Sequence, residues 1–348
     1  MKAVIVKEVG VLELQDVLEP EPNSDQIKVK IAYSGICGSD LKIIDSSGMP
    51  EPLCGAIGWA QKNAPIREGA RILGHEASGT IVKIGKDIKG NFKVGQRVPM
   101  NFFSTCGSCY YCLNGMAQYC ERLAYQSGAM TEYATYQENI VFPIPDDVPL
   151  DIAAFCEPVS IAVHAIDIAH IKAGDSVIIT GGGSIGLLIL QLAIKSGAAK
   201  VLVSEPIAER RKMAKQLGAD VVVDPLTEDL LKISNKFTDG RGYNVCFEAS
   251  GKVASAIQLV LLAEVGGAIV LAATYPENVD ITIPIFYLWT RDLTIRTVMP
   301  NPHSFPRAVQ ILRKLNLKPL IKVYPLTEAI TAFGAFKMGK GIKIMLQP

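Results

Sequence analysis

The stretch SVIITGGGSIG, residues 176–186, decides the architecture of half of the chain. Its first residues are rich in β-branched side chains and run directly into the pattern G-x-G-x-x-G, which an apolar helical segment, 187–195, follows. This pattern, placed between a strand and a helix, is typical of a turn that binds a dinucleotide. Gly181 permits the tight turn, Gly183 lets the backbone approach a pyrophosphate, and Gly186 lets the helix pack closely on the strand.

The residues within and after this turn complete the expected cofactor site. Ser184 and Ile185 open the helix, whose N-terminus offers free N–H groups to phosphates. The next predicted strand, 200–204, ends at Glu205, about twenty residues further on, as the dinucleotide fingerprint requires. Its carboxylate can accept hydrogen bonds from both ribose hydroxyls and would repel a 2'-phosphate, so it favours NAD over NADP. Arg210 either contacts a cofactor phosphate or begins a solvated helix.

The whole chain divides into two parts by the type of pattern it carries. With 348 residues, it is long enough for two domains. Before residue 150 the strand signals are short and separated by turn residues, as in the alternating run 27–31 and in 140–143, which predicts a β-rich domain. From Ile152 onward helices and strands alternate, beginning with an expected apolar helix over 152–168, which predicts an α/β fold with an open, doubly wound parallel sheet. Its strands are expected at 176–180, 200–204, 221–223, 245–248 and 268–272.

Four cysteines are clustered in TCGSCYYCLNGMAQYC, residues 105–120. Cys106, Cys109, Cys112 and Cys120 form a C-x2-C-x2-C-x7-C array, whose thiolates can converge on one tetrahedral ion. Zinc is the expected ion, and an iron–sulfur cluster is the alternative, although the proline that often follows the last cysteine of such clusters is missing. Four thiolates leave no open position on zinc, so this ion should hold the lobe together and take no part in chemistry.

Composition excludes several other classes. Lys and Arg number 35 against 34 Asp and Glu, so the charge points neither to nucleic acid nor to an anionic membrane. The first seven residues lack the apolar core of a signal peptide, and later apolar runs are too short to span a bilayer. We therefore expect a cytoplasmic protein, whose eight cysteines indicate metal binding or catalysis before disulfides.

The motifs occur in an order that resembles a known family. Residues 35–40 (GICGSD), 74–85 (GHEASGTIVKIG), the four-cysteine lobe, 156–160 (CEPVS) and the glycine-rich turn together resemble the zinc-containing alcohol dehydrogenases of the medium-chain dehydrogenase/reductase superfamily. GHEASGT and EPVSIAVHA are most similar to the polyol (sorbitol) dehydrogenase branch. The resemblance implies a GroES-like catalytic domain (1–152 and 290–348, with the structural-zinc lobe at about 104–122), split around a Rossmann domain (153–289).

The resemblance also implies a second, catalytic zinc, hence two zinc ions per chain. Cys37 and His75 match its ligands, and Glu157 matches a carboxylate that binds the metal directly or through water. Glu76 matches a glutamate that can exchange onto the ion, so Glu76, Glu157 and water compete for one position. Such a site keeps an open position, where a substrate hydroxyl can lose its proton. The carbon of the resulting alkoxide can then give hydride to NAD held between the domains. Ser39 matches the hydroxyl that takes this proton.

The expected substrate is a small alcohol, and the family pattern leaves its identity open. Lys42 and Ile43 stand where polyol dehydrogenases commonly carry His and an aromatic residue, and residues 298–301 lack the arginine of sorbitol dehydrogenases. The loop of about 46–71 looks like an insertion between the two metal-ligand segments; it either contacts substrate or makes a subunit contact. We therefore expect a polyol, cyclitol, sugar or sugar phosphate, with L-threonine, another amino alcohol or a simple secondary alcohol as the alternative. The candidate substrate residues in the insertion are Trp59, Lys62 and Arg67.

Two other classes explain only part of the sequence. A zinc-free quinone or enoyl reductase on the same fold would need neither Cys37 nor His75 nor the cysteine lobe. A nucleic-acid-binding zinc module would explain the cysteines, but the balanced charge and the glycine-rich turn oppose it. The expected partners are therefore a small molecule and further copies of the chain, as a homodimer or homotetramer, with no nucleic acid and no membrane.

Overall fold

The computed structural model describes residues 1–45, 71–275 and 279–348. The chain forms two compact units, Met1–Ser160 with Asn301–Pro348, and Ile161–Pro300. The sequence placed these boundaries at 152/153 and 289/290. Both boundaries lie later in the structure, the second because β15 (Thr294–Thr297) still belongs to the parallel sheet of the second unit.

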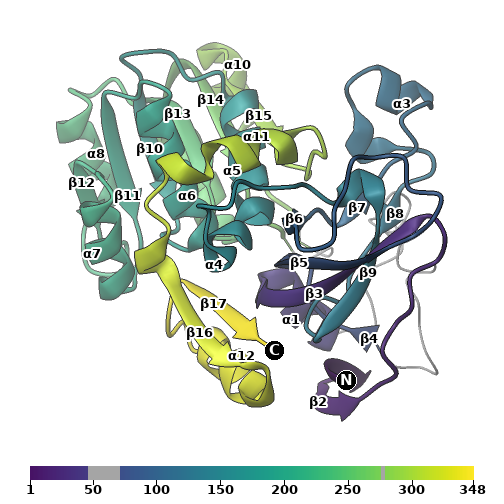
Figure 1. Cartoon of the computed structure of the whole chain (residues 1–348). Coiled ribbons are helices and arrows are strands. Elements are labelled where there is room, and N and C mark those ends of the chain that lie inside the picture. The colour runs from purple at the N-terminus through teal and green to yellow at the C-terminus, as the bar shows by residue number, and fades with distance from the viewer. Residues whose placement is uncertain (46–70, 276–278) are drawn as a thin grey trace. The chain divides into compact units, whose positions relative to one another are not determined.

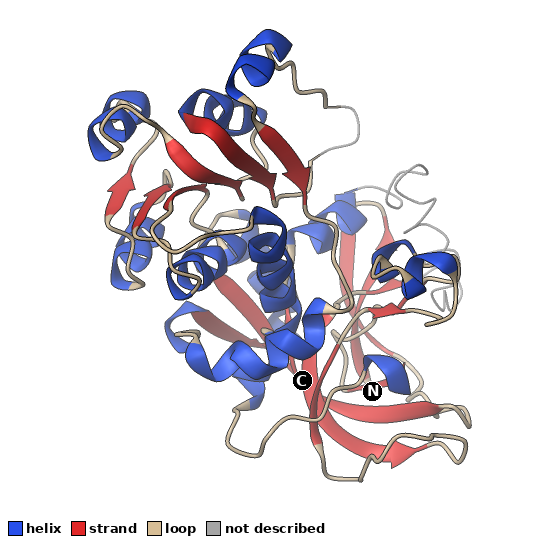
Figure 2. Ribbon diagram, turned by 90° about the horizontal axis from the view of Figure 1, so that it is seen from above, coloured by secondary structure: helices blue, strands red, loops and turns tan. Residues whose placement is uncertain are grey.

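The second unit is built on an open sheet of six parallel strands, in the order β12-β11-β10-β13-β14-β15. Helices cover both faces of this sheet (Figure 2). The predicted doubly wound α/β fold is therefore confirmed. The remaining elements are β10 (Ser176–Thr180), β11 (Lys200–Ser204), β12 (Val221–Val223), β13 (Tyr243–Glu248) and β14 (Ala263–Leu271), with α6 (Ser184–Lys195), α7 (Ala208–Gln216), α8 (Leu230–Phe237), α9 (Val253–Leu262) and α10 (Ile285–Arg291).

The first unit is mainly β-structure. Its largest sheet has the order β16-β17-β3-β5-β6, and β9 also pairs with β3 (Figure 1). The strands are β1 (Lys2–Glu8), β2 (Val11–Asp16), β3 (Gln26–Gly35), β4 (Arg71–Ile72), β5 (Glu76–Ile84), β6 (Arg97–Met100), β7 (Phe103–Ser104), β8 (Ala124–Tyr125), β9 (Tyr133–Gln137), β16 (Ile321–Pro325) and β17 (Lys343–Gln347). The helices that begin in this unit are α1 (Gly38–Asp45), α3 (Tyr110–Leu113), α4 (Leu150–Ala153), α5 (Cys156–Ala169), α11 (Ser304–Ile311) and α12 (Ala329–Lys337).

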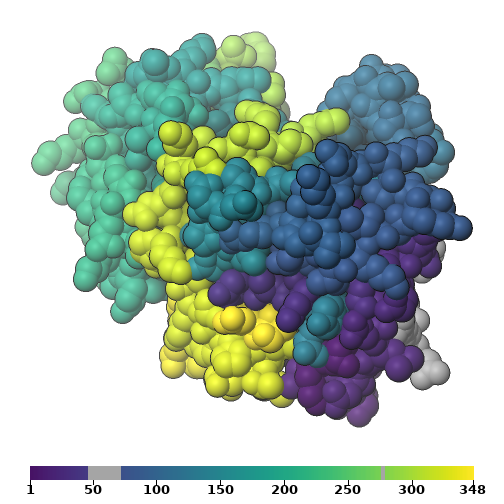
Figure 3. All heavy atoms as spheres, viewed as in Figure 1, coloured from purple at the N-terminus to yellow at the C-terminus, as the bar shows by residue number. Residues whose placement is uncertain are grey.

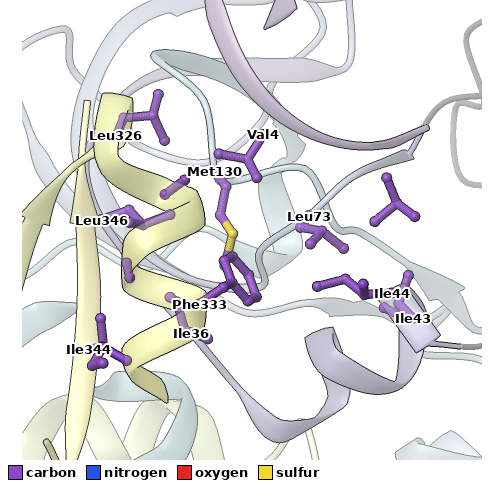
Figure 4. Packing of buried hydrophobic residues seen from close by; sticks show 14 residues of the cluster. Val4, Ile36, Ile43, Ile44, Leu73, Met130, Leu326, Phe333, Ile344 and Leu346 are labelled. Carbon is purple, nitrogen blue, oxygen red and sulfur yellow. The ribbon is translucent and has the colours of Figure 1, made fainter. Parts of the chain in front are cut away.

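The C-terminal residues return to the N-terminal strands, as the family resemblance implied. In β17, Leu346 pairs antiparallel with Ser34 of β3, and the yellow C-terminal atoms pack against the purple N-terminal ones in Figure 3. One apolar cluster joins the two ends of the chain: Met130 lies beside Phe333 of α12, with Val4 nearby (Figure 4). Burial of these side chains fixes β17 next to β3, which matters for the site below.

Two local expectations were wrong. The expected single helix over 152–168 is two helices, α4 and α5, interrupted at Ala154 and Phe155. The expected strand over 140–143 is a 3-10 turn, Glu138–Ile140, followed by an isolated bridge from Val141 to Met100. Prolines at 143 and 145 remove the N–H groups that a longer ladder would need. No helix in the described part of the chain is long and apolar enough to cross a bilayer.

Candidate active site and metal centres

Pairing between β3 and β5 brings Cys37 and His75 together. Gly35, the last residue of β3, pairs with Glu76, the first residue of β5. Cys37 follows the end of β3 and His75 precedes the start of β5, so both lie at the same end of the sheet. The ligand atoms of Cys37, His75 and Glu76 all lie within 4.8 Å of one another. A thiol, an imidazole and a carboxylate at this spacing form a donor set suited to zinc.

Asp40 connects the two main ligand candidates. It is fully buried in α1, and its Oδ2 accepts a hydrogen bond of 2.8 Å from the backbone N–H of Cys37. Its Oδ1 lies 3.5 Å from Nδ1 of His75. A carboxylate beside Nδ1 keeps the proton on that nitrogen and leaves the lone pair on Nε2 for a metal. Asp40 therefore accepts a hydrogen bond from the backbone of one candidate ligand and lies close to the ring of the other without a hydrogen bond to it.

Glu76 forms an ion pair with Lys343, a residue that sequence reasoning missed. Both side chains are 2% exposed, and Nζ of Lys343 also donates to the backbone oxygen of Ile36 at 3.2 Å. Burial lowers the pKa of Lys343, but the charges of Glu76 and Cys37 outweigh burial and raise it overall. Gly35 leaves the space for this pair, because a Cβ there would collide with the Glu76 carboxylate. In the sequence, the one indication of a buried charged residue was a single lysine at the start of the apolar segment KIMLQ.

Glu157 is buried near the start of α5 but is not among the three converging ligands. Burial raises the pKa of its carboxyl to about 8, and the charge of Glu76 adds to the rise. Two buried carboxyl groups, together with Asp40 and the Cys37 thiol, put more acidic groups here than Lys343 and His75 can balance. A divalent cation would relieve this excess, so the residues present fit a metal ion.

Ser39 and two aromatic rings border His75. Oγ of Ser39 lies 3.5 Å from Nε2 of His75, and its side chain is half-buried. The ring centroids of Phe102 and Tyr125 lie 5.3 and 6.4 Å from that of His75. These rings, which sequence reasoning also missed, keep water from one side of the imidazole. Their signal was weak, since apolar residues beside a strand end are common in any core.

The four lobe cysteines converge as predicted from their spacing. Their Sγ atoms lie within 4.8 Å of one another, and no cysteine of the described chain is in a disulfide. Backbone N–H groups of Cys106 and Arg122 each donate to Sγ of Cys120 at 3.3 Å. The N–H of Ser108 is the main cause that lowers the pKa of Cys106 to about 5, whereas burial raises the pKa of Cys112 to about 12 and also raises that of Cys120. The convergence of four sulfur atoms is therefore what makes the lobe fit a bound metal ion.

The glycine-rich turn has the close approaches that its pattern predicts. Gly181 has φ +98°, a left-handed conformation that favours glycine. A Cβ at Gly186 would collide with the backbone oxygen of Gly181, so the helix can approach the strand only with glycine here. Gly183 caps α6 without a side-chain hydrogen bond, and Ser184 and Ile185 form its first turn. The first N–H groups of α6 therefore have no capping side chain to compete with a phosphate.

Glu205 follows β11 and lies against this turn. Its Oε2 accepts from the N–H of Gly182 at 2.6 Å and its Oε1 from the N–H of Ile207 at 2.9 Å. Arg211 donates to the backbone oxygen of Glu205 and pairs with Asp224 at 3.1 Å. Arg211 is thus held by protein groups, while Arg210 lies half-buried in the first turns of α7. The candidate substrate residues Trp59, Lys62 and Arg67 lie outside the described residues.

Comparisons with known proteins agree with this geometry. Residues 23–146 match the alcohol dehydrogenase GroES-like domain, and residues 184–314 match the zinc-binding dehydrogenase domain. The chain belongs to the zinc-binding alcohol dehydrogenases of the medium-chain dehydrogenase/reductase superfamily, and it is an oxidoreductase. Its relatives include members of the polyol branch.

Three curated relatives span nearly the whole chain. D-arabitol-phosphate dehydrogenase of Enterococcus avium is 33% identical over 95% of this chain and 92% of its own length. L-threonine 3-dehydrogenase of Pyrococcus abyssi is 32% identical over 96% of this chain and 94% of its own length. Sorbitol dehydrogenase of Gallus gallus is 31% identical over 99% of this chain and 96% of its own length.

Solved structures are similar over their full length. A putative zinc-binding dehydrogenase from Clostridium scindens has a TM-score of 0.90 at 27% identity, covering 100% of this chain and 99% of its own. One from Sinorhizobium meliloti, bound to NADP, has a TM-score of 0.87 at 28% identity and the same coverage. Galactitol-1-phosphate dehydrogenase from Escherichia coli has a TM-score of 0.86 at 26% identity, with both chains covered completely.

Proposed function

We propose that the protein is a zinc-dependent NAD(H) oxidoreductase that interconverts a secondary alcohol of a polyol, cyclitol, sugar or sugar phosphate and the corresponding ketone. The observation that carries this proposal is the convergence of Cys37, His75 and Glu76 within 4.8 Å, with Asp40 next to both of the first two. When bound, zinc would polarise the substrate hydroxyl and nicotinamide would exchange hydride with the carbon.

The chain's own residues then have separate roles. Cys37 and Nε2 of His75 hold the metal, and Asp40 fixes the imidazole tautomer. Glu76, which is paired with Lys343, converges with Cys37 and His75, so Glu76, Glu157 and water compete for the remaining ligand position. Ser39, whose Oγ lies 3.5 Å from Nε2 of His75, takes the proton that leaves the substrate hydroxyl and passes its own proton on toward solvent. Cys106, Cys109, Cys112 and Cys120 hold a second zinc that stabilises the lobe.

NAD is the preferred nicotinamide cofactor in this proposal. Glu205 places a carboxylate beside the glycine-rich turn, at the point where the adenosine ribose of a dinucleotide is expected. The negative charge of Glu205 would repel a 2'-phosphate. Arg211 is held in an ion pair with Asp224, so it is not placed to offset this repulsion. Gly181, Gly183, Ser184, Ile185 and Gly186 hold the pyrophosphate. Arg210, in the first turns of α7, is the residue whose sequence position allows a contact with a cofactor phosphate.

A phosphorylated polyol is the substrate that this chain's own residues favour. Lys42 lies on α1 beside Cys37, where burial lowers the pKa of its ammonium group. A cation this close to Cys37 would attract an anionic group of the substrate. Two of the similar proteins named above act on sugar-alcohol phosphates. The alternative is an amino alcohol such as L-threonine, since a relative of similar identity is an L-threonine dehydrogenase.

We also propose that the protein is a homodimer or homotetramer. Among the described residues, β15 is the last strand of the sheet of the second unit, and no described strand pairs with its outer edge. Next to it, α10 exposes Ile285, Phe286 and Trp289, each more than 70% exposed. A second copy related by a twofold axis would pair the same edge antiparallel with itself and cover these side chains.

Initial-rate screening tests the proposal directly. Sorbitol, arabitol phosphate, galactitol phosphate and L-threonine are each offered with NAD and with NADP, and zinc is measured in the same preparation. We expect the highest kcat/KM with a polyol phosphate and NAD. Turnover of L-threonine alone would favour the alternative, and turnover that survives complete removal of zinc would overturn the proposal. Light scattering of wild type and Trp289→Lys tests the oligomer: a monomeric wild type would contradict it.

A further inference from the structure

The sheet of the second unit reverses its strand order between β10 and β13. The chain proceeds from β10 to β11 and β12 in one direction, then crosses to β13, β14 and β15 in the other. In open α/β sheets, ligands bind outside the carboxyl ends of the strands at such a reversal. Thr180 and Glu248 are the last residues of β10 and β13 and pair with each other. Glu248 therefore lies at the floor of the proposed dinucleotide site.

Glu248 is a fully buried carboxylate with a complete set of donors. Its Oε1 accepts from the N–H of Ser250 at 2.8 Å and from the hydroxyl of Ser250. Its Oε2 accepts from the N–H of Gly251 at 3.1 Å and from the hydroxyl of Tyr275 at 2.5 Å. Four hydrogen bonds to one buried carboxyl group order the segments that supply the donors.

Those donors come from two different loops. Ser250 and Gly251 follow β13, whereas Tyr275 lies beyond the end of β14. The backbone adds to the connection, because the oxygen of Glu248 accepts from the N–H of Ala272 at 2.8 Å. Tyr275 is thus the side chain that ties the second loop to the first at the carboxyl edge of the sheet.

The loop after β13 also lies directly against the glycine-rich turn. A Cβ placed at Gly181 would fall 2.7 Å from the backbone nitrogen of Ser250 and 2.8 Å from the carbonyl carbon of Ala249. The N–H of Ala249 donates to the oxygen of Thr180 at 2.8 Å. A shift of this loop would therefore move the turn that is expected to hold the pyrophosphate.

We infer that Glu248 and Tyr275 are positioning residues for the cofactor, which hold the loops after β13 and β14 in register with the glycine-rich turn. The inference rests on the proposed dinucleotide site. Neither side chain needs to touch the cofactor, since their effect passes through Ser250, Gly251 and Gly181. Loss of the Tyr275 hydroxyl leaves one buried carboxylate oxygen with a single donor, and the two loops lose their side-chain connection.

The test measures NADH affinity of the full-length protein by fluorescence titration, together with the thermal midpoint. The variants are Tyr275→Phe and Glu248→Gln, and the matched control is Tyr287→Phe, whose exposed hydroxyl only reaches the oxygen of Leu261 at 3.5 Å. We expect Kd for NADH to rise on the order of tenfold in Tyr275→Phe and in Glu248→Gln, and to stay unchanged in the control.

The outcomes separate this inference from the proposed function. If wild type binds NADH and both variants bind it within about twofold of wild type, the inference is wrong. A lowered thermal midpoint with unchanged Kd would also overturn it, because the two residues would then have a purely structural role. If wild type does not bind NADH at all, the proposed function fails first, and the inference fails with it.

Discussion

Substitution of Lys343 by methionine tests the electrostatic design of the proposed active site. Methionine has a similar length, so the change removes the charge and the hydrogen bond to Ile36 while filling most of the space. Glu76 then stays buried, 2% exposed, without its cation. Removing one partner of a buried ion pair typically destabilises a protein by about 3–5 kcal/mol. We expect a loss of this size in the free energy of unfolding, measured by urea denaturation of the zinc-free protein.

A second variant and a control separate charge from packing. Lys343→Met/Glu76→Gln removes both charges and should recover at least about 2 kcal/mol of the loss, since no unpaired charge remains. Lys340→Met removes an exposed lysine nearby and should change stability by less than about 0.5 kcal/mol. If Lys343→Met costs less than about 1 kcal/mol, or if the double variant is no more stable than the single one, the ion pair does not have the role given to it here.

Four further predictions concern other parts of the molecule. Lys42→Met should raise KM for a polyol phosphate about tenfold or more and leave KM for the unphosphorylated polyol within about twofold; equal effects on both would contradict phosphate recognition. Gly334→Ala in α12 meets no atom within 4 Å and should raise the free energy of unfolding by about 0.5–1 kcal/mol, whereas a loss would mean that this helix is packed more tightly than described. Cys109→Ser should remove one zinc per chain and lower the thermal midpoint while NADH binding persists, and retention of both metals would refute a structural site. In the zinc-free protein the folded Glu157 carboxyl, with its pKa of about 8, holds its proton more tightly than an ordinary carboxyl at 4.5; stability should therefore fall as pH rises between these values, and Glu157→Gln should flatten that part of the profile.

The fold was predictable because its strongest signals are local. The strand, glycine-rich turn and helix at 176–195 specify one βα unit, and the cysteine spacing specifies one lobe. Predicted strands such as 200–204 and 221–223 coincide with β11 and β12. The break between α4 and α5 was missed although Pro158, in the first turn of α5, is a residue that favours the start of a helix over its interior.

The site was predictable only in part, because some of its residues act across large sequence separations. Cys37 and His75 carry motif signals, and strand pairing brings them together. Lys343 reaches Glu76 only because β17 returns to β3, and nothing in its local sequence identifies a partner so far away. The family resemblance identified Glu157 as a candidate ligand. Its burial and its raised pKa depend on the residues packed around the start of α5, which the sequence alone does not show. The hydrogen bond from Tyr275 to Glu248 likewise joins two segments that no sequence motif connects.

Zinc content per chain, measured together with NAD-dependent polyol oxidation, tests the central claim most directly. Wild type should contain about two zinc ions, and Cys37→Ser or His75→Ala should contain about one, keep the folded lobe and lose turnover. A variant that retains both zinc ions, or one that loses zinc from this site and still oxidises the alcohol, would contradict the assignment of Cys37 and His75 to a catalytic metal.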